Sequence, residues 1–149
     1  MIIIDSREKK FEHITAYFEK HSVPYEIKKL DTGDYMNTDN PNVVVDRKAN
    51  LQEVCSNLSY GKSNRIRFAH ECERGFANKL RIVVLIEGTN YKELSEIKEW
   101  KSKHSAHTGR WLLDSMFRLT MAFGVEWQLC RKNTTAKRIL EILEYREEK

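Results

Sequence analysis

Two aspartates and a lysine in segment 33–48 have the residue types and spacing of a hydrolytic metal site. Asp34 lies near the start of one expected strand and Asp46 near the end of the next, so their carboxylates can face each other across an antiparallel pair. Lys48 lies two residues beyond Asp46, and the two-residue period of a strand returns its side chain to the same face. The simpler alternative is that Asp46 and Lys48 form only an ion pair at the end of a strand.

Two carboxylates this close repel each other unless one is protonated or a cation lies between them. Mg²⁺ suits such a pair because it prefers hard oxygen ligands and keeps several waters, so two carboxylates and a substrate phosphate are enough. An ammonium beside the ion can orient the attacking water and help to lower its pKa. The pattern therefore predicts hydrolysis of a phosphodiester bond.

The elements that must position these residues alternate between strand and helix. Strands are expected at residues 1–5 and 25–30, in a hairpin with arms 33–38 and 43–48 and a turn at 39–42, and at 80–88 and 125–130. Helices are expected at residues 9–21, 50–58, 64–79, 110–124 and 134–148, with Asn50 at the start of the second and Gly124 at the end of the fourth. A hairpin among crossover units indicates an α/β domain with a mixed sheet.

The composition is that of one folded domain in the cytoplasm. The chain has 149 residues, 40% of them hydrophobic and 32% charged, which is enough to bury a core without disulfides or a structural metal. No run reaches the roughly 20 apolar residues of a membrane span, and the apolar N-terminal stretch is too short for a signal peptide. The three cysteines, at positions 55, 72 and 130, form no Cys-x-x-Cys pair and are expected to be reduced and buried.

Cations gather in two segments of a chain whose net charge is +4. Residues 62–81 carry six cations against two acids, and a second group comprises Lys98, Lys101, Lys103 and Arg110. Such clusters either cover solvated helix faces or follow the phosphates of a nucleic acid. The charge distribution alone leaves both interpretations open.

Three short motifs, in order, give the sequence a resemblance to a known family. They are Asp5-Ser6-Arg7-Glu8 near the first strand, Gly33-Asp34 on the hairpin, and Asp46-Arg47-Lys48 at its end. Together they resemble the motifs of the XPF-type structure-specific endonucleases, within the restriction-endonuclease-like superfamily. Two positions depart from the family pattern, because Asp46 replaces a glutamate and Gln52 stands where the family has an acid. Glu53 follows Gln52 directly and is an alternative source of that charge.

The resemblance implies a three-layer restriction-endonuclease-like fold, with a central mixed sheet flanked by helices. It also implies metal-dependent endonuclease activity on DNA, with branched or forked DNA as a candidate substrate. The carboxylates that would hold Mg²⁺ or Mn²⁺ are those of Asp5, Asp34 and Asp46. Lys48 would serve the attacking water, and Arg7 and Arg47 would hold phosphate or pair with the carboxylates. Glu8 would be a metal ligand or an acid in the first turn of a helix. The residues expected to contact DNA are Lys62, Arg65, Arg67, Lys101 and Lys103.

The resemblance also bears on organisation and partners. Relatives that choose branched DNA usually add helix-hairpin-helix modules or a helicase, whereas residues 1–149 are expected to form a single nuclease domain without either. A homodimer is implied, with Trp111, Met116 and Phe123 of the broad apolar helix as candidate contacts. Neither a nucleotide cofactor nor a membrane partner is expected. Two alternatives stay open, namely a catalytically silent DNA-binding subunit and a protein-interaction module in which the motifs and basic clusters are coincidental.

Overall fold

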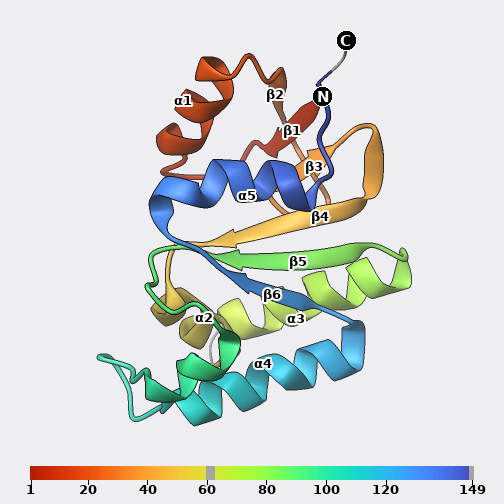
Figure 1. Ribbon diagram of the computed structural model, residues 1–149. Helices are drawn as coiled ribbons and strands as arrows, with labels where there is room; N and C mark the ends of the chain where they lie inside the picture. Colours follow the sequence, from red (N-terminus) through yellow and green to blue (C-terminus); the bar gives the residue numbers. More distant parts are fainter. Residues whose placement is uncertain (60–62, 148–149) are drawn as a thin grey trace.

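Six strands form a mixed sheet at the centre of the protein (Figure 1). The computed structural model describes residues 1–59 and 63–147. The strand order is β2-β1-β3-β4-β5-β6, with β1 at Ile2–Asp5, β2 at Tyr25–Lys28, β3 at Tyr35–Asn37, β4 at Asn40–Lys48, β5 at Arg81–Ile86 and β6 at Glu126–Leu129. Strand β3 is antiparallel to both β1 and β4, while the other neighbouring pairs are parallel. The mixed α/β sheet predicted from the sequence is confirmed.

Helices cover both faces of this sheet and complete three layers (Figure 1). On one face α1 (Glu12–Lys20) packs against α5 (Thr135–Ile142). The other face is covered by α2 (Leu51–Leu58), α3 (Ser63–Ala77) and α4 (Gly109–Phe123). A short 3-10 helix, η1 (Leu94–Glu99), packs against α4, and another, η2 (Lys132–Thr134), precedes α5.

The alternation of side chains along β4 divides the core in two. Val44 belongs to the cluster under α2, α3 and α4, whereas Val43 and Val45 belong to the cluster under α1 and α5. The same alternation continues to the end of the strand. It directs Asp46 and Lys48 toward α2 and α3, and Arg47 toward α1 and α5.

The hairpin turn is shorter than the sequence predicted, because a side chain closes it early. The Asp39 amide donates a hydrogen bond to Asn37 Oδ1 (3.1 Å), a local turn that asparagine favours. Strand β4 therefore begins at Asn40, not at residue 43. Pro41 and Asn42 remain exposed beside an irregularity in the β3–β4 register, which is where a strand tolerates proline.

The last helix is also shorter than predicted, since α5 ends at Ile142 and not at residue 148. The side-chain amides of Asn37 and Asn40 donate to the Leu143 carbonyl at 3.2 and 3.3 Å. Glu144 then has a left-handed φ of 54°, which ends helical geometry. Contacts with the hairpin thus stop the helix, and these contacts are tertiary.

The end of α4 and the state of the cysteines agree with the sequence. Gly124 ends α4 with a left-handed φ of 70°, as predicted. All three cysteines are free and buried, which confirms the expected reduced thiols. In the described part of the chain, no helix is long and apolar enough to cross a membrane.

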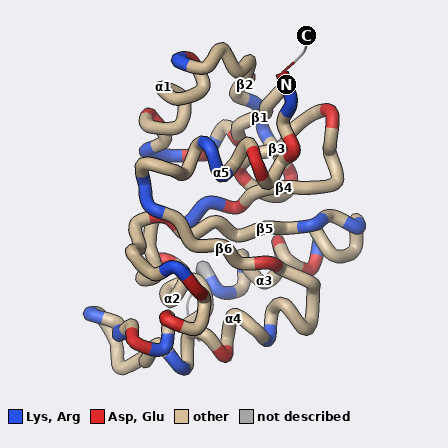
Figure 2. Tube along the Cα trace, viewed as in Figure 1, with Lys and Arg blue, Asp and Glu red and all other residues tan. Residues whose placement is uncertain are grey.

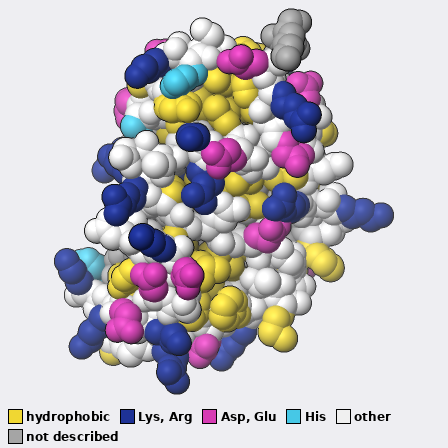
Figure 3. Space-filling model, viewed as in Figure 1, with side chains coloured by type: hydrophobic (Ala, Val, Ile, Leu, Met, Phe, Trp, Pro, Cys, Tyr) yellow, Lys and Arg dark blue, Asp and Glu magenta, His cyan; other side chains and the backbone are white. Residues whose placement is uncertain are grey.

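The apolar breadth of α4 is explained partly by burial. Met116 is 0% exposed, so its assignment as a dimer contact is wrong: it packs in the core beneath the helix. Phe123 is half-buried and contacts Phe76 of α3 edge to face, with ring centroids 6.0 Å apart. Phe117 and Met121 are exposed, and Figure 3 shows hydrophobic side chains at the surface around α4.

Candidate active site

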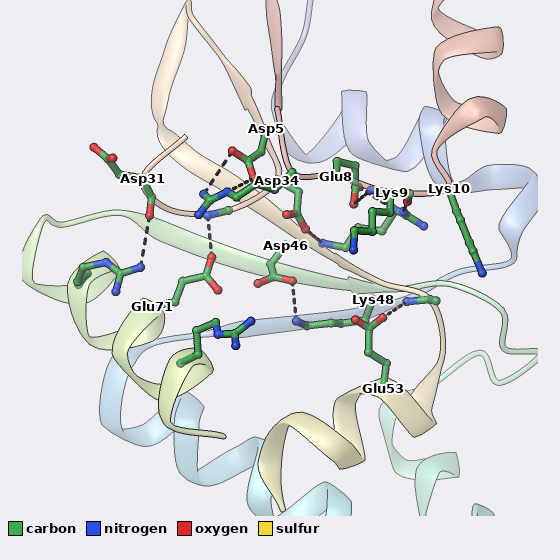
Figure 4. Close-up of a pocket in the computed structure, with 16 residues that line it drawn as sticks. Asp5, Glu8, Lys9, Lys10, Asp31, Asp34, Asp46, Lys48, Glu53 and Glu71 are labelled. Carbon is green, nitrogen blue, oxygen red and sulfur yellow. Dashed lines mark hydrogen bonds and ion pairs between the residues drawn. The ribbon is translucent and has the colours of Figure 1, made fainter. Parts of the chain in front are cut away.

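A cavity of about 540 Å³ lies at the end of β4 and takes in all six residues to which the sequence assigned catalysis (Figure 4). These residues are Asp5, Arg7, Asp34, Asp46, Arg47 and Lys48. Asp34, Asp46, Lys48 and Glu71 point into a shared space (Figure 4), and we call these four residues the carboxylate floor.

The turn before β3 fixes Asp34 beside the end of β4. Gly33 adopts a φ of +79°, and a Cβ there would lie 2.8 Å from the Val44 side chain, so glycine lets the two chains approach. The Asp34 amide donates to the Val45 carbonyl (2.7 Å), and the Arg47 amide donates to Asp34 Oδ2 (2.8 Å). The carboxylate is therefore held next to Asp46 by backbone geometry.

Asp46 and Lys48 form the ion pair that the simpler alternative required. Lys48 Nζ lies 3.1 Å from Asp46 Oδ1 and 4.6 Å from the centroid of the Phe68 ring. Burial by itself lowers the pKa of Lys48, but the charges of Asp46, Glu53 and Asp34 outweigh burial and raise it above its usual value. Lys48 is accordingly a cation at neutral pH, suited to orienting a water or an oxyanion and not to accepting a proton.

Glu71 of α3 is a floor residue that the sequence reasoning missed. Its Oε1 accepts a hydrogen bond from the Gly33 amide (2.8 Å), which ties α3 to the turn carrying Asp34. Burial and the neighbouring Asp46 raise the pKa of Glu71 to about 7. A signal was present, because Glu71 lies next to Cys72 and three residues after Phe68, both buried on the inner face of the helix. An acid at such a position needs a reason to be there.

The floor carries more negative charge than its own cation neutralises. Burial, and then the charges of Asp46 and Glu8, raise the pKa of Asp34 well above its usual value. Lys48 pairs directly with Asp46, while the charge of Arg7 also reaches Asp34 and Glu71, so three carboxylates share one directly paired cation among the described floor residues. Among residues 1–59 and 63–147, no three or more His, Cys, Asp or Glu side chains converge into a metal cage of their own. The arrangement instead suits a cation that completes its shell with water and phosphate.

Asp5 lies at the edge of the same cavity with its oxygens already engaged. Arg7 donates to both carboxylate oxygens, from Nε at 3.0 Å and from Nη2 at 3.3 Å, and the Leu30 amide donates at 2.8 Å. The hydrogen bond and charge of Asp5 raise the pKa of Arg7. Of the two roles offered for Arg7, the structure thus contains the bidentate pair with a carboxylate.

Arg47 turns away from the floor and joins a second group of charges under α1 and α5. Its Nε donates to Glu8 Oε2 (2.8 Å), its Nη1 to Glu87, and its Nη2 to the Lys9 carbonyl (2.6 Å). Glu87 also pairs with His13 (2.9 Å) and accepts from Thr135. We call Glu8, His13, Arg47, Glu87 and Thr135 the buried charge cluster. Since α1 begins at Glu12, the interpretation of Glu8 as an acid in its first turn is wrong.

Exposed cations surround the cavity entrance. They are Lys9 and Lys10 before α1, and Arg67 and Arg74 on α3, and we call them the basic rim. Figure 2 shows basic residues interleaved with acids along the segments near this end of the sheet. Of the expected DNA contacts, Arg67 belongs to the rim and Arg65 lines a separate groove between α3 and α4. Lys101 and Lys103 lie in another cavity, and Lys62 lies outside the described residues.

The structure separates the roles of Gln52 and Glu53 at the start of α2. Gln52 Oε1 accepts a hydrogen bond from Ser102 Oγ (3.1 Å), in the loop before α4. Glu53 accepts from the Ala49 amide (2.7 Å), and its own amide donates to Asn50 Oδ1 (2.8 Å), so the helix start holds it in place. The charge of Glu53 acts on Lys48. The acid beside the lysine is therefore Glu53, one residue after the position the motif indicated.

Comparison with known proteins decides the family. The family model of the ERCC4 domain matches residues 4–142. The chain belongs to the ERCC4 domain family. This membership confirms the resemblance to XPF-type nuclease domains that the three motifs indicated. A search of curated proteins gave no match.

Solved structures agree with the ERCC4 assignment. XPF from Aeropyrum pernix is similar with a TM-score of 0.71 and 20% identity, over 98% of this chain and 62% of that one. The same protein in complex with DNA gives a TM-score of 0.71 and 19% identity, over 96% of this chain and 62% of that one. This chain thus spans 62% of the length of the matched XPF chains. The predicted restriction-endonuclease-like fold is confirmed.

Proposed function

We propose that this ERCC4-domain protein is a metal-dependent endonuclease that hydrolyses phosphodiester bonds in DNA. The observation that carries the proposal is the grouping of one buried carboxylate, Asp46, with the half-buried carboxylates of Asp34 and Glu71 in the floor, below a rim of exposed cations. Acids whose pKa values are raised by burial and by neighbouring carboxylates, as for Asp34 and Glu71, are costly to a fold, so their grouping in a cavity favours a functional site. The basic rim suits the phosphates of a nucleic acid.

The carboxylate floor fits Mg²⁺ or Mn²⁺, because its donors are hard oxygens and its charge is in excess. Asp34 and Asp46 would hold the ion directly, and Asp5, whose oxygens are held by Arg7 and Leu30, would act through water. When bound, such an ion supplies charge stabilisation at the phosphate and lowers the pKa of a bound water.

The chain's own groups account for the remaining requirements of hydrolysis. Lys48, held between Asp46 and the Phe68 ring, would orient the attacking water with its ammonium. Arg67 and Arg74 of the rim would hold phosphates on either side of the scissile bond. Glu71 would keep the turn at Gly33 in place, and with it Asp34. Lys48 comes from the end of β4, whereas Arg67, Glu71 and Arg74 all come from α3, so the docking of α3 on the sheet fixes their relative positions.

The alternative of a silent DNA-binding subunit rested on the acid missing at Gln52. That argument is weakened because Glu53 supplies a negative charge beside Lys48. We therefore favour the active enzyme, with branched or forked DNA as the substrate class and the cytoplasm as its compartment. We retain a homodimer in the proposal, now through exposed Phe76, Phe117 and Met121 of α3 and α4. Light scattering at micromolar concentration should give twice the 17.7 kDa of the chain, and the monomer mass would refute the dimer.

The decisive experiment is to incubate plasmid, single-stranded and forked DNA with Mg²⁺, Mn²⁺ or EDTA. Cleavage that requires the metal, and that disappears in Asp46→Asn, would establish the enzyme. Asp114→Asn is the matched control, because it removes an exposed carboxylate on α4, away from the floor. Retardation of DNA without cleavage would establish the silent subunit. The absence of both retardation and cleavage would favour the protein-interaction module.

A further inference from the structure

A second cavity, of about 520 Å³, lies between the loop after β5 and the loop before α4. Its lining combines two aromatic side chains, Tyr91 and Trp100, with Lys101, Lys103, His104 and Asn50. We call it the aromatic-basic groove. Nothing in the proposed cleavage step uses these aromatic residues.

The groove is connected to the carboxylate floor. A cavity of about 500 Å³ between them is lined at one end by Lys48, Glu53 and Glu71, which also line the floor cavity. At its other end it shares Asn50 and Gln52 with the aromatic-basic groove. Three adjacent cavities therefore follow one another from the end of β4, over the first turn of α2, to Tyr91 and Trp100.

The aromatic rings pack against the core, whereas the cations are exposed to solvent. Tyr91 and Trp100 are half-buried and pack against the core under α4. Lys101, Lys103 and His104 are exposed. Half-buried rings beside exposed cations are the features with which proteins bind unpaired nucleic acid, because bases stack on the rings while cations follow the phosphates. Bases inside a duplex are stacked on each other and cannot use such rings.

The loop that carries the cations is fastened to α2. Lys101 and Thr108 form an isolated β-bridge, and the Ser102 amide donates to the His107 carbonyl (3.2 Å). The buried Ser102 hydroxyl donates to Gln52 Oε1 (3.1 Å). An amide at position 52 thus holds the loop beside the path from the floor.

We infer that the aromatic-basic groove binds an unpaired DNA strand next to the bond that the floor cleaves. Bases of this strand stack on Tyr91 and Trp100, and its phosphates pair with Lys101 and Lys103. Gln52 is a positioning residue, since it acts on the strand through Ser102. The location of the cleaved bond rests on the proposed nuclease function, whereas strand binding in the groove can be measured without cleavage.

The test measures the affinity of labelled oligo-dT, about 12 nucleotides long, and of a blunt duplex by fluorescence anisotropy in EDTA. Tyr91→Leu should weaken oligo-dT binding by about 10-fold, because stacking on one ring contributes about 1–3 kcal/mol, and should leave duplex binding unchanged. Tyr91→Phe keeps the ring and should restore oligo-dT affinity. Equal losses for both DNAs, or no loss for either, would overturn the inference.

Charge is tested separately from stacking. Lys101→Gln/Lys103→Gln should weaken oligo-dT binding by about 10-fold and flatten its salt dependence. The matched control is Lys20→Gln/Lys137→Gln, which removes two exposed lysines from α1 and α5, outside the three cavities described above. If this control loses as much affinity, the binding is general attraction and the groove assignment is wrong.

A measurement on the unaltered protein covers the case in which a ring variant fails to fold. Oligo-dT containing 5-iodo-deoxyuridine should cross-link on irradiation to Tyr91 or Trp100, as mapped by mass spectrometry. Cross-links only outside the groove would overturn the inference. Metal-dependent nicking together with unaltered oligo-dT binding in Tyr91→Leu would support the nuclease function and refute strand binding in the groove. Groove-dependent strand binding without nicking would support the groove and refute the nuclease function.

Discussion

Successive side chains at the end of β4 point to opposite faces of the sheet, and the two faces differ in how their carboxylates are paired with cations. Under α1 and α5, Arg47 is matched by Glu8 and Glu87 in the buried charge cluster. Under α2 and α3, Asp46 shares one lysine with Asp34 and Glu71. On the first face both carboxylates pair directly with Arg47, whereas on the second Lys48 pairs directly with Asp46 and acts on Asp34 and Glu71 only at longer range.

The acids on the two faces respond in opposite directions. Although burial raises it, hydrogen bonds from Thr135 and His13 and the charge of Arg47 lower the pKa of Glu87. Burial and nearby carboxylates raise the pKa values of Asp34 and Glu71. Carboxylates that pair directly with a cation hold elements together. Carboxylates without such a partner destabilise the fold, and a bound metal ion would relieve that cost. This difference separates scaffold from site more clearly than the sequence motif, which treats Asp46, Arg47 and Lys48 as one unit.

The largest effect that we expect is on activity, from the unmatched face. Asp46→Asn should lower the nicking rate by about 1,000-fold or more, because it removes direct stabilisation of the metal and phosphate charge. Its melting temperature should change little, because a repelling carboxylate is removed while Lys48 loses the charge of its ion-pair partner. Retention of a tenth of the wild-type rate would mean that Asp46 does not hold the ion.

The matched face should show the largest effect on stability. Arg47→Ala leaves Glu8 and Glu87 buried without their cation and should lower the free energy of unfolding by about 3–5 kcal/mol. Urea denaturation measures this loss. Arg81→Ala is the control, because the Arg81–Glu126 pair on neighbouring strands is about half exposed and should cost no more than about 1 kcal/mol. Similar losses in both variants would remove the distinction between the two faces.

The Mg²⁺ concentration needed for cleavage can show which acid acts on Lys48. Glu53→Gln keeps an acceptor for the Ala49 amide but removes the charge, and should raise the Mg²⁺ concentration for half-maximal cleavage by about 10-fold. Gln52→Asp should change this concentration little, because the Gln52 side chain is directed to Ser102. If Gln52→Asp lowers the requirement and Glu53→Gln has no effect, the family position has kept its role in this protein.

A further expected effect is a dependence of stability on pH. The pKa of Glu71 rises from 4.5 to about 7 on folding, so the folded state holds this proton more tightly than the unfolded state. The resulting stability is complete below pH 4.5 and is lost as the pH rises through 7. Glu71→Gln should therefore gain stability relative to wild type, by about 1–3 kcal/mol, between pH 4.5 and 8.

Glu71→Gln keeps an oxygen for the Gly33 amide, so the comparison isolates the charge. Urea denaturation in EDTA at several pH values gives the difference. Glu73→Gln alters an exposed acid two residues along the same helix and should show no such trend. A Glu71→Gln difference that is constant with pH would contradict the assignment of raised pKa to this carboxyl.

The sequence predicted those parts of the site that depend on local periodicity. Strand alternation and the Gly33 turn were enough to bring Asp34, Asp46 and Lys48 together. Glu71 could not be placed, because it enters the floor only through the docking of α3 on the hairpin.

Side-chain contacts between residues far apart in the chain could not be predicted from the sequence either. The pairing of Arg47 with Glu87 requires the parallel register in which Lys48 lies opposite Ile86. Gln52 was expected near Lys48 from its motif position, yet side-chain direction on α2 and the loop before α4 decide its contact with Ser102. Met116 was assigned to the surface because a broad apolar helix face does not reveal which side is covered.

The two asparagines that bind the Leu143 carbonyl also bear on when the site is formed during synthesis. Every floor residue has been translated by Glu71, but the hairpin that carries Asp34 is clasped by a residue that the ribosome adds much later. A nascent chain thus contains its reactive carboxylates well before their support is complete. The contact of Asn37 and Asn40 with the Leu143 carbonyl can form only once α5 has left the exit tunnel and docked, so this part of the hairpin's support is added at the end of folding.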